Sequence, residues 1–317
     1  MNTDTIEKFF ADSPCILSEG AVIERIRRDG EFELDPHVVN SAFIYDEPQR
    51  MALEKIYRQY IEIGRDFDLP LLLSTPTWRA GRLRIKDAGY EGRDLNGDNF
   101  RYLDSLRKSY GEYGKKIIIC GLMSCRKDAY KPEESLGVEE AHEFHTWQAA
   151  RLAEAGVDFT LASTLPALDE AKGLALALAD AGAPYIISFI ARKEGTMLDG
   201  TPLKKAVSEI DKAANPAPAA YMINCTHASF AKAALMNSEN CPPVVRERMI
   251  GLLANTAALS PEDLNNSKEL VEEDPEVFAK SVSELYIEPG LKILGGCCGT
   301  DERHIRALAS QLAALSK

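Results

Sequence analysis

The chain has 317 residues, of which 45% are hydrophobic, and 37 basic against 49 acidic side chains give it a formal charge of −12. This length suits one large α/β domain with a sizeable core, so we expect a single domain over residues 1–317. An acidic balance of this size argues against nucleic acid or an anionic membrane as the partner.

The first 12 residues do not pair a basic stretch with an apolar run, so they do not resemble a secretory signal. No later segment approaches the ~20 consecutive apolar residues that span a bilayer. We therefore expect a cytoplasmic protein.

Short apolar runs alternate along the chain with longer amphipathic segments. Eight runs are predicted strands: Cys15–Leu17, Leu69–Ser74, Ile117–Cys120, Phe159–Ala162, Tyr185–Phe189, Ala220–Asn224, Gly251–Ala254 and Leu291–Leu294. The segments between and after them are predicted helices: Gln49–Asp66, Asn99–Tyr113, Glu139–Ala155, Leu168–Ala181, Pro202–Ala214, Phe230–Met236, Pro275–Ile287 and Glu302–Ala314. In the first helix, Leu53, Ile56, Tyr60 and Ile63 recur at spacings of three and four, which gives one apolar stripe.

Strands that alternate with helices pair in parallel, and eight such units predict a closed (β/α)8 TIM barrel. A doubly wound open sheet is the alternative, but it is typical of chains with a Gly-x-Gly-x-x-Gly turn after an early strand, which is absent. The acidic stretch Thr256–Asp274, after the seventh strand, is predicted as a loop with some helix.

Seven cysteines occur, an odd number at wide spacings, which does not indicate a disulfide framework. Three of them belong to motifs that directly follow predicted strands. Cys225 lies in Asn-Cys-Thr after the sixth strand, and Cys297 and Cys298 lie in Gly-Gly-Cys-Cys-Gly-Thr after the eighth. Both motifs fall at the C-terminal face of a barrel, where active sites are built, so the three thiols are expected to converge.

Three thiolates suit a tetrahedral zinc ion and leave its fourth position open, which is the arrangement of a catalytic site. The glycines around Cys297 and Cys298 permit the sharp bend that lets adjacent cysteines share one metal. A substrate thiol at the open position would lose its proton and attack an electrophilic methyl group. The other four cysteines are interpreted as packing residues: Cys15, Cys120, Cys125 and Cys241.

Some further residues indicate weaker hypotheses. His142 and His145 share a helix face but do not form a His-Glu-x-x-His motif, so we interpret them as ordinary helix residues. His227 is either a loop histidine or part of the barrel mouth. Trp78 is interpreted as a packing residue, although its ring could also contact a methylated cation.

At its cysteine motifs the sequence resembles the homocysteine S-methyltransferase family, which carries Asn-Cys after strand six and Gly-Gly-Cys-Cys-Gly-Thr after strand eight. The resemblance extends to Tyr60–Asp66, Ser74–Trp78 and Leu152–Asp158. It implies a (β/α)8 barrel enzyme in which Zn²⁺ activates a small thiol such as homocysteine toward a small methyl donor. It also implies a substrate pocket, with no catalytic residue beyond the metal ligands, formed by Glu19, Gly20, Thr75, Thr77, Ser163 and Asn224.

The sequence departs from the family pattern at the amino-acid end of that pocket. The family's Asp-Gly pair is Glu19-Gly20 here, and a later glycine is Ile23. The Glu-Thr pair after strand four, whose carboxylate holds the substrate ammonium, is Ser163-Thr164, and a hydroxyl does not replace a carboxylate in that role. After strand three the family's Gly-Pro is replaced by Met123–Cys125. We therefore expect the metal end to be preserved and homocysteine to be a poor acceptor.

Three alternatives stay open at this point. The chain is a divergent member that acts on another thiol or methylated compound, a non-catalytic protein that binds zinc or thiols, or a demethylase that works with a corrinoid carrier. The carrier module itself is not visible in the sequence. The donor can be a sulfonium, betaine or a folate, and formation of a homo-oligomer is compatible with the sequence.

Overall fold

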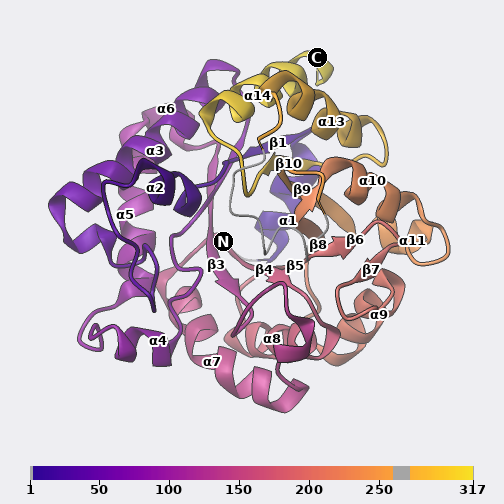
Figure 1. Cartoon of the computed structure of the whole chain (residues 1–317), viewed down its shortest axis with the longest axis horizontal. Helices are drawn as coiled ribbons and strands as arrows, with labels where there is room; N and C mark the ends of the chain where they lie inside the picture. The colour runs from indigo at the N-terminus through magenta and orange to yellow at the C-terminus, as the bar shows by residue number, and fades with distance from the viewer. Residues whose placement is uncertain (1–2, 260–271, 317) are drawn as a thin grey trace.

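The computed structural model describes residues 3–259 and 272–316. Eight parallel strands close into a barrel in the order β1-β10-β9-β8-β5-β4-β3-β2 (Figure 1). Their bounds are β1 (Ile16–Ser18), β2 (Leu71–Ser74), β3 (Ile117–Ser124), β4 (Phe159–Leu165), β5 (Tyr185–Phe189), β8 (Ala220–His227), β9 (Met249–Asn255) and β10 (Ile293–Gly296). All eight strands expected from the sequence are present.

A long helix follows each strand and covers the outside of the barrel (Figure 1). These helices are α3 (Glu47–Asp66), α5 (Leu95–Ser109), α7 (Val138–Ala155), α8 (Leu168–Ala181), α9 (Leu203–Ala213), α10 (Ala228–Met236), α13 (Pro275–Ile287) and α14 (Glu302–Leu315). The predicted (β/α)8 barrel is therefore confirmed. Among the described residues, none of the helices is long and apolar enough to cross a membrane.

Shorter elements lie in the connections. They are α2 (Ile23–Asp29), α4 (Arg82–Asp87), α6 (Gly111–Gly114), α11 (Pro243–Arg246), the 3-10 turns η1 (Phe43–Tyr45) and η2 (Pro132–Glu134), and the hairpin of β6 (Ala191–Arg192) with β7 (Thr196–Met197). None of these was expected from the sequence. Of the predicted loop Thr256–Asp274, residues 260–271 lie outside the described part of the chain.

The predicted helix Asn99–Tyr113 was wrong at both ends. Helix α5 begins four residues earlier, at Leu95, because the side chain of Asp94 accepts a hydrogen bond from the backbone N–H of Gly97 and so caps the first turn. It ends at Ser109, before Gly111, whose φ of +54° is left-handed and interrupts the helical hydrogen bonds. A separate turn, α6, follows.

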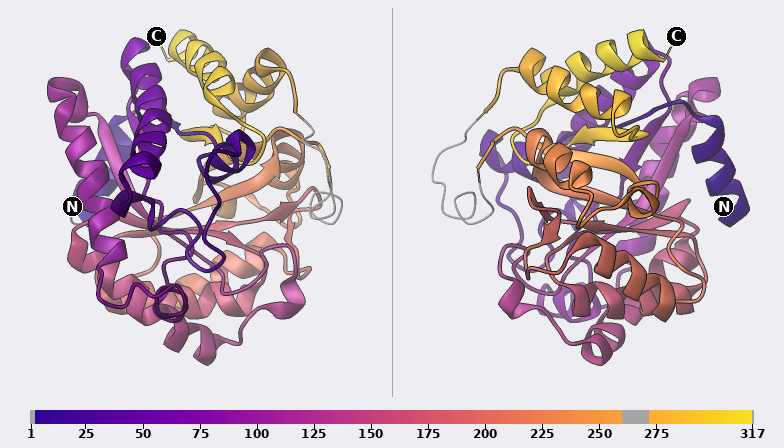
Figure 2. Two further views of the ribbon diagram at one scale, coloured as in Figure 1. Left: turned by 60° about the vertical axis from the view of Figure 1, so that its left-hand side comes forward. Right: turned by 90° about the vertical axis from the view of Figure 1, so that its right-hand side faces the viewer.

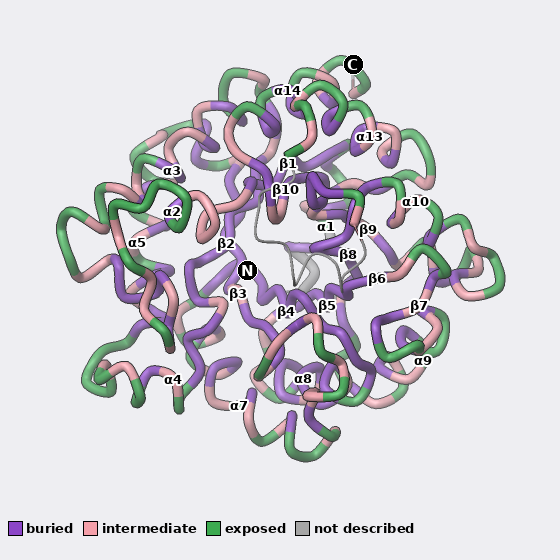
Figure 3. Tube along the Cα trace, viewed as in Figure 1, coloured by how far each residue is buried: buried purple, intermediate pink, exposed green. Residues whose placement is uncertain are grey.

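The interior of the barrel is closed at its N-terminal end by helix α1 (Thr3–Asp12). Ile6 and Phe10 pack among inward-facing residues of the strands, and the rings of Phe10 and Phe159 meet edge to face at 5.8 Å. Figure 3 shows the strands buried at the centre and the outer faces of the helices exposed. Helix α1 lies at the end of the barrel opposite the C-terminal edges of the strands (Figure 2). A ligand would therefore enter the barrel from the C-terminal side.

Candidate metal centre and substrate pocket

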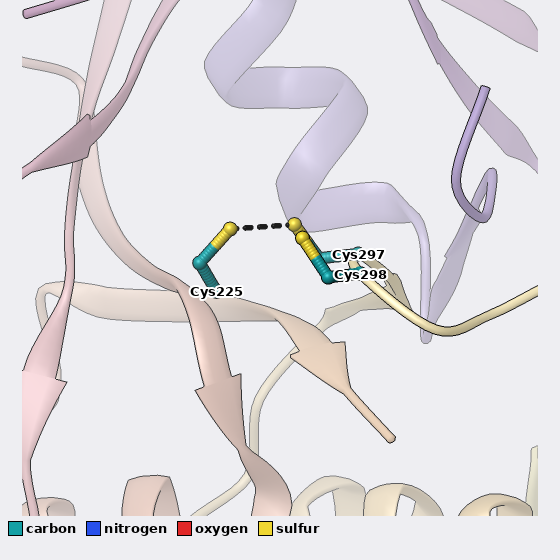
Figure 4. Close-up of side chains that lie close together, drawn as sticks. All are labelled: Cys225, Cys297 and Cys298. Atoms are coloured by element: carbon teal, nitrogen blue, oxygen red, sulfur yellow. Dashed lines mark hydrogen bonds between the residues drawn. The ribbon is translucent and has the colours of Figure 1, made fainter. Parts of the chain in front are cut away.

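Three cysteine thiols meet at the C-terminal mouth of the barrel. Cys225 lies within β8, whereas Cys297 and Cys298 follow β10, and the three Sγ atoms lie within 4.8 Å of one another. The Sγ atoms of Cys225 and Cys297 are 2.7 Å apart, with all three side chains pointing to one spot (Figure 4). Cys225 is buried and the other two are half-buried. The expected convergence of these residues is thus present in the fold.

A local irregularity in β8 aims Cys225 at this spot. Its φ is +51°, in the left-handed region, and the pairing of β8 with β9 shifts register between Asn224 and Thr226. The side chain of Asn224 fixes the bend, because its Oδ1 accepts from the Thr164 N–H at 2.9 Å and from the Ser188 hydroxyl at 2.7 Å. The amide therefore ties β8 to β4 and β5 at the point where the backbone is strained.

Glycine is required in the loop that carries the paired cysteines. A Cβ on Gly299, whose φ is +88°, would lie 1.8 Å from Thr256 Oγ1, and one on Gly296 would lie 2.3 Å from Thr300 Oγ1. The loop is also held by hydrogen bonds from its backbone. Cys297 N–H donates to Ala254 O at 2.7 Å, Cys298 N–H to Asn255 Oδ1 at 3.2 Å, and Gly299 N–H to Glu24 Oε2 at 2.5 Å.

The electrostatics of the thiols favour a bound cation. Hydrogen bonds from Cys225 and Cys298 lower the pKa of Cys297 well below its usual range, while the hydrogen bond with Cys297 raises the pKa of Cys225. One negative charge is therefore easily held, but ionising all three neighbouring thiols needs a compensating cation. Sulfur donors select soft ions such as zinc.

The spacing of the sulfur atoms fits a tetrahedral ion after a small adjustment. Zinc–sulfur bonds of about 2.3 Å place two ligand sulfurs about 3.8 Å apart. The three Sγ atoms already lie within 4.8 Å, and only Cys225 and Cys297, at 2.7 Å, must separate.

Tyr130, from the segment between β3 and α7, also contacts this cluster. Burial, the nearby thiols and a hydrogen bond with Cys225 raise the pKa of its phenol above the usual range. Nothing in the local sequence indicates this role, because the residue reaches the cysteines only through the path of its loop.

The thiols border a cavity of about 250 Å³. The expected substrate-binding residues that line it are Glu19, Gly20, Thr75, Ser163 and Asn224. Thr77 is not among the lining residues. Its hydroxyl instead bonds to Thr75 Oγ1 at 2.7 Å and to the carbonyl of Leu122 at 2.8 Å, which braces the segment after β2.

The side chain of Glu19 is buried with one of its oxygens unpaired. Oε1 accepts from Ser74 N–H at 3.1 Å, whereas Oε2 has no partner among the described residues. Burial raises the pKa of this carboxyl to about 8. The Ser163 hydroxyl, by contrast, donates to the carbonyl of Met123 at 3.3 Å. The wall at Ser163 therefore has no carboxylate to meet an ammonium group.

The weaker sequence hypotheses separate in the structure. His145 is buried against Glu170 at 3.2 Å, while His142 pairs with Asp180 at the surface, so the two histidines share no site. Trp78 lines the cavity, with the Arg79 guanidinium 4.2 Å from its ring. His227 is buried, and its Nδ1 bonds to Ser229 Oγ at 2.8 Å.

Comparison with known proteins decides the family. The family model described as homocysteine S-methyltransferase matches residues 16–312. The chain belongs to the homocysteine S-methyltransferase family. It is therefore a methyltransferase by class. Its cysteine motifs belong to the sixth and eighth strands of the barrel, but Cys225 lies within β8 and not after it, because β8 extends to His227 and not only to Asn224 as predicted.

Individual relatives agree with the family over most of the chain. Homocysteine S-methyltransferase YbgG of Bacillus subtilis is 27% identical and covers 94% of each chain. Homocysteine S-methyltransferase 2 of Arabidopsis thaliana is 27% identical over 56% of this chain and 52% of its own. The metallated form of homocysteine methyltransferase MmuM from Escherichia coli has the same fold, with a TM-score of 0.74, 20% identity, and 95% and 97% coverage.

Proposed function

We propose that this family member is a zinc-dependent S-methyltransferase, which moves a methyl group from a sulfonium or quaternary ammonium donor to a small thiol of the homocysteine class. One observation carries the proposal: the thiols of Cys225, Cys297 and Cys298 converge at the edge of a small cavity at the barrel mouth. Three sulfur ligands leave one position on a tetrahedral ion for the substrate.

The chemistry follows from the donor set. Zinc, when bound, would stabilise the deprotonated form of the acceptor thiol, so that a nucleophile is available near neutral pH. The residues of the chain hold the cysteines in place through the Asn224 amide and the backbone bonds of the loop after β10. A donor methyl group on a cationic centre is a suitable electrophile because its positive charge is neutralised as the bond breaks.

The choice of acceptor depends on the wall of the cavity beside Ser163. Because the Ser163 hydroxyl bonds to a backbone carbonyl and supplies no charge, an α-ammonium group has lost one partner expected in the family. We propose that homocysteine itself is a poor acceptor, and that a thiol without the ammonium group competes well with it.

Three measurements test the proposal on protein purified under reducing conditions. Elemental analysis should find about one zinc per chain, as a three-cysteine site predicts. Thiol titration should reveal about three additional reactive groups after chelation, because released thiolates are the reactive form. Turnover with homocysteine and related thiols should be detected with at least one of S-methylmethionine, S-adenosylmethionine and betaine. Zinc without any turnover across this panel would favour the non-catalytic alternative.

A further inference from the structure

Two polar side chains that the metal chemistry does not use line the same cavity as the cysteines. Asn40, from the segment between α2 and η1, is only 1% exposed. Its Nδ2 is buried and lacks a hydrogen-bond partner among the described residues. A buried amide without partners is costly unless a ligand supplies them, so this group is expected to face a polar part of the substrate.

Arg27 lies at the rim of the cavity, on helix α2. The other two arginines of that helix are paired: Arg25 with Glu302 at 2.7 Å and Arg28 with Glu24 at 2.8 Å. Arg27 is exposed and has no ion pair within the described part of the chain, and it lines the same cavity as Cys298. A guanidinium without a partner beside the metal ligands is available for an anionic group of the ligand.

We infer that Arg27 and Asn40 bind a carboxylate of the acceptor, so that this protein selects thiols that carry one. The inference rests on the proposed function, because it needs the acceptor sulfur to lie at the cysteine cluster. An amide N–H and a guanidinium both donate, which matches the oxygens of a carboxylate and opposes an ammonium at the same place. The cavity of about 250 Å³ keeps any group joined to that sulfur by a short chain close to its walls.

The family resemblance concerns the partner of the substrate ammonium group, whereas this inference concerns the partners of the substrate carboxylate. Glu19 Oε2, the other unpartnered atom of the cavity, can accept from an ammonium where the ligand has one. The carboxylate end is instead formed by residues that no sequence motif indicates. Binding should therefore depend more on the carboxylate than on the ammonium.

A matched set of four thiols tests this on the zinc-loaded protein without any methyl donor. Homocysteine carries both charged groups, 4-mercaptobutyrate only the carboxylate, 3-aminopropanethiol only the ammonium, and propanethiol neither. The dissociation constant of homocysteine, measured by isothermal titration calorimetry, should be roughly tenfold lower than that of 3-aminopropanethiol. The dissociation constant of 4-mercaptobutyrate should be lower than that of propanethiol by a similar factor, as expected for charge-assisted hydrogen bonds at a partly exposed site.

Two variants assign the preference to its residues. Arg27→Gln should remove most of the carboxylate preference, and Asn40→Asp should invert it toward 3-aminopropanethiol, with each affinity expressed relative to that of propanethiol for the same variant. Arg82→Gln is the matched control, since Arg82 is also exposed but does not line the cavity. Zinc content and circular dichroism establish that each variant is folded and loaded.

The outcomes separate the inference from the proposed function. If all four thiols bind wild type with similar affinity, the carboxylate site is wrong and the thiol methyltransferase stands. The same conclusion follows if the preference survives in both variants. If none of the thiols binds at millimolar concentration, the proposed function fails and the inference fails with it.

Discussion

The backbone of the cysteine loop and the side chains at the other end of the cavity differ in how completely their polar groups are paired. At the metal end, the N–H groups of Cys297, Cys298 and Gly299 all have acceptors, so the loop keeps its shape without a ligand. At the other end, Glu19 Oε2 and Asn40 Nδ2 have no partner among the described residues. The comparison separates a preorganised reactive centre from a recognition surface that is completed only when a substrate binds. Substitutions at the second end can therefore change which thiol is accepted without disturbing the cysteine cluster.

The largest effect is expected from substituting one of the three cysteines at the metal end. Cys298→Ser should lose most of the bound zinc and lower kcat/KM by about a thousandfold or more, because removal of one of three ligands destroys both the site and the activated thiol. Elemental analysis and turnover measure the two effects. Cys241→Ser, at a buried cysteine away from the cavity, is the control and should retain its zinc. Full zinc in Cys298→Ser would show that the ligands are assigned wrongly.

The recognition end can be changed by restoring a carboxylate. Ser163→Glu should raise kcat/KM for homocysteine by tenfold or more relative to 4-mercaptobutyrate, since a charged partner for a partly buried ammonium is worth roughly 2–5 kcal/mol. Ser163→Gln introduces a side chain of nearly the same size as glutamate but without its charge. It therefore shows whether a gain in kcat/KM depends on the charge or on the shape of the side chain. A wild type that already prefers homocysteine strongly, with no gain in Ser163→Glu, would contradict the remodelled pocket.

A milder test concerns the support of the cysteine loop. Glu24 accepts from Gly299 N–H and is paired with Arg28, so Glu24→Gln should weaken zinc binding by about tenfold, as loss of an outer-shell partner does. Competition with a metal chelator measures the change. Glu33→Gln, on an exposed acidic residue just beyond the same helix, should leave zinc affinity at the wild-type value. Equal affinities for Glu24→Gln and wild type would mean that the loop holds the metal without this contact.

A separate prediction concerns the pH dependence of stability and not the reaction. Burial raises the pKa of Glu19 from 4.5 to about 8, so the folded protein holds this proton more tightly than the unfolded chain. The stabilisation is present below pH 4.5 and is lost as the pH rises toward 8. Glu19→Gln should therefore gain up to about 1.4 kcal/mol per pH unit over wild type in this window.

Urea unfolding at several pH values measures this difference. The groups that face Glu19 stay neutral throughout, because burial raises the pKa of Tyr57, Tyr60 and Cys120 above its usual range. A constant difference between variant and wild type from pH 5 to 8 would show that Glu19 is ionised throughout.

The fold and the convergence of the three cysteines could be predicted because their signals are local. Apolar runs of strand length mark the eight strands, and Gly-Gly-Cys-Cys-Gly-Thr has a composition that core packing does not require. Even helix α1 had a usable signal, since Ile6, Phe9 and Phe10 recur at helical spacing. The alternation of strands and helices does not predict it, because it precedes the first strand of the barrel.

The other residues that line the cavity or contact the cysteines have no such signal. Arg27, Asn40 and Tyr130 lie in connections whose paths are set by tertiary packing, and no motif in the sequence around them indicates a site. Thr77 differs in the opposite sense, because the family resemblance implies a pocket residue whereas its hydroxyl bonds to the carbonyl of Leu122 and braces the backbone. Side-chain direction in such segments depends on contacts that the sequence pattern does not encode.

The helix that closes the bottom of the barrel also determines how this protein can be attached to something else. Helix α1 packs into the end of the barrel away from the cysteines, and Lys292 Nζ holds its last turn by bonding to Phe10 O at 2.8 Å. A surface tether or fused partner at the N-terminal end would therefore face away from the open mouth. Immobilised in that orientation, every molecule on a sensor chip would present the same face to thiols in the flow.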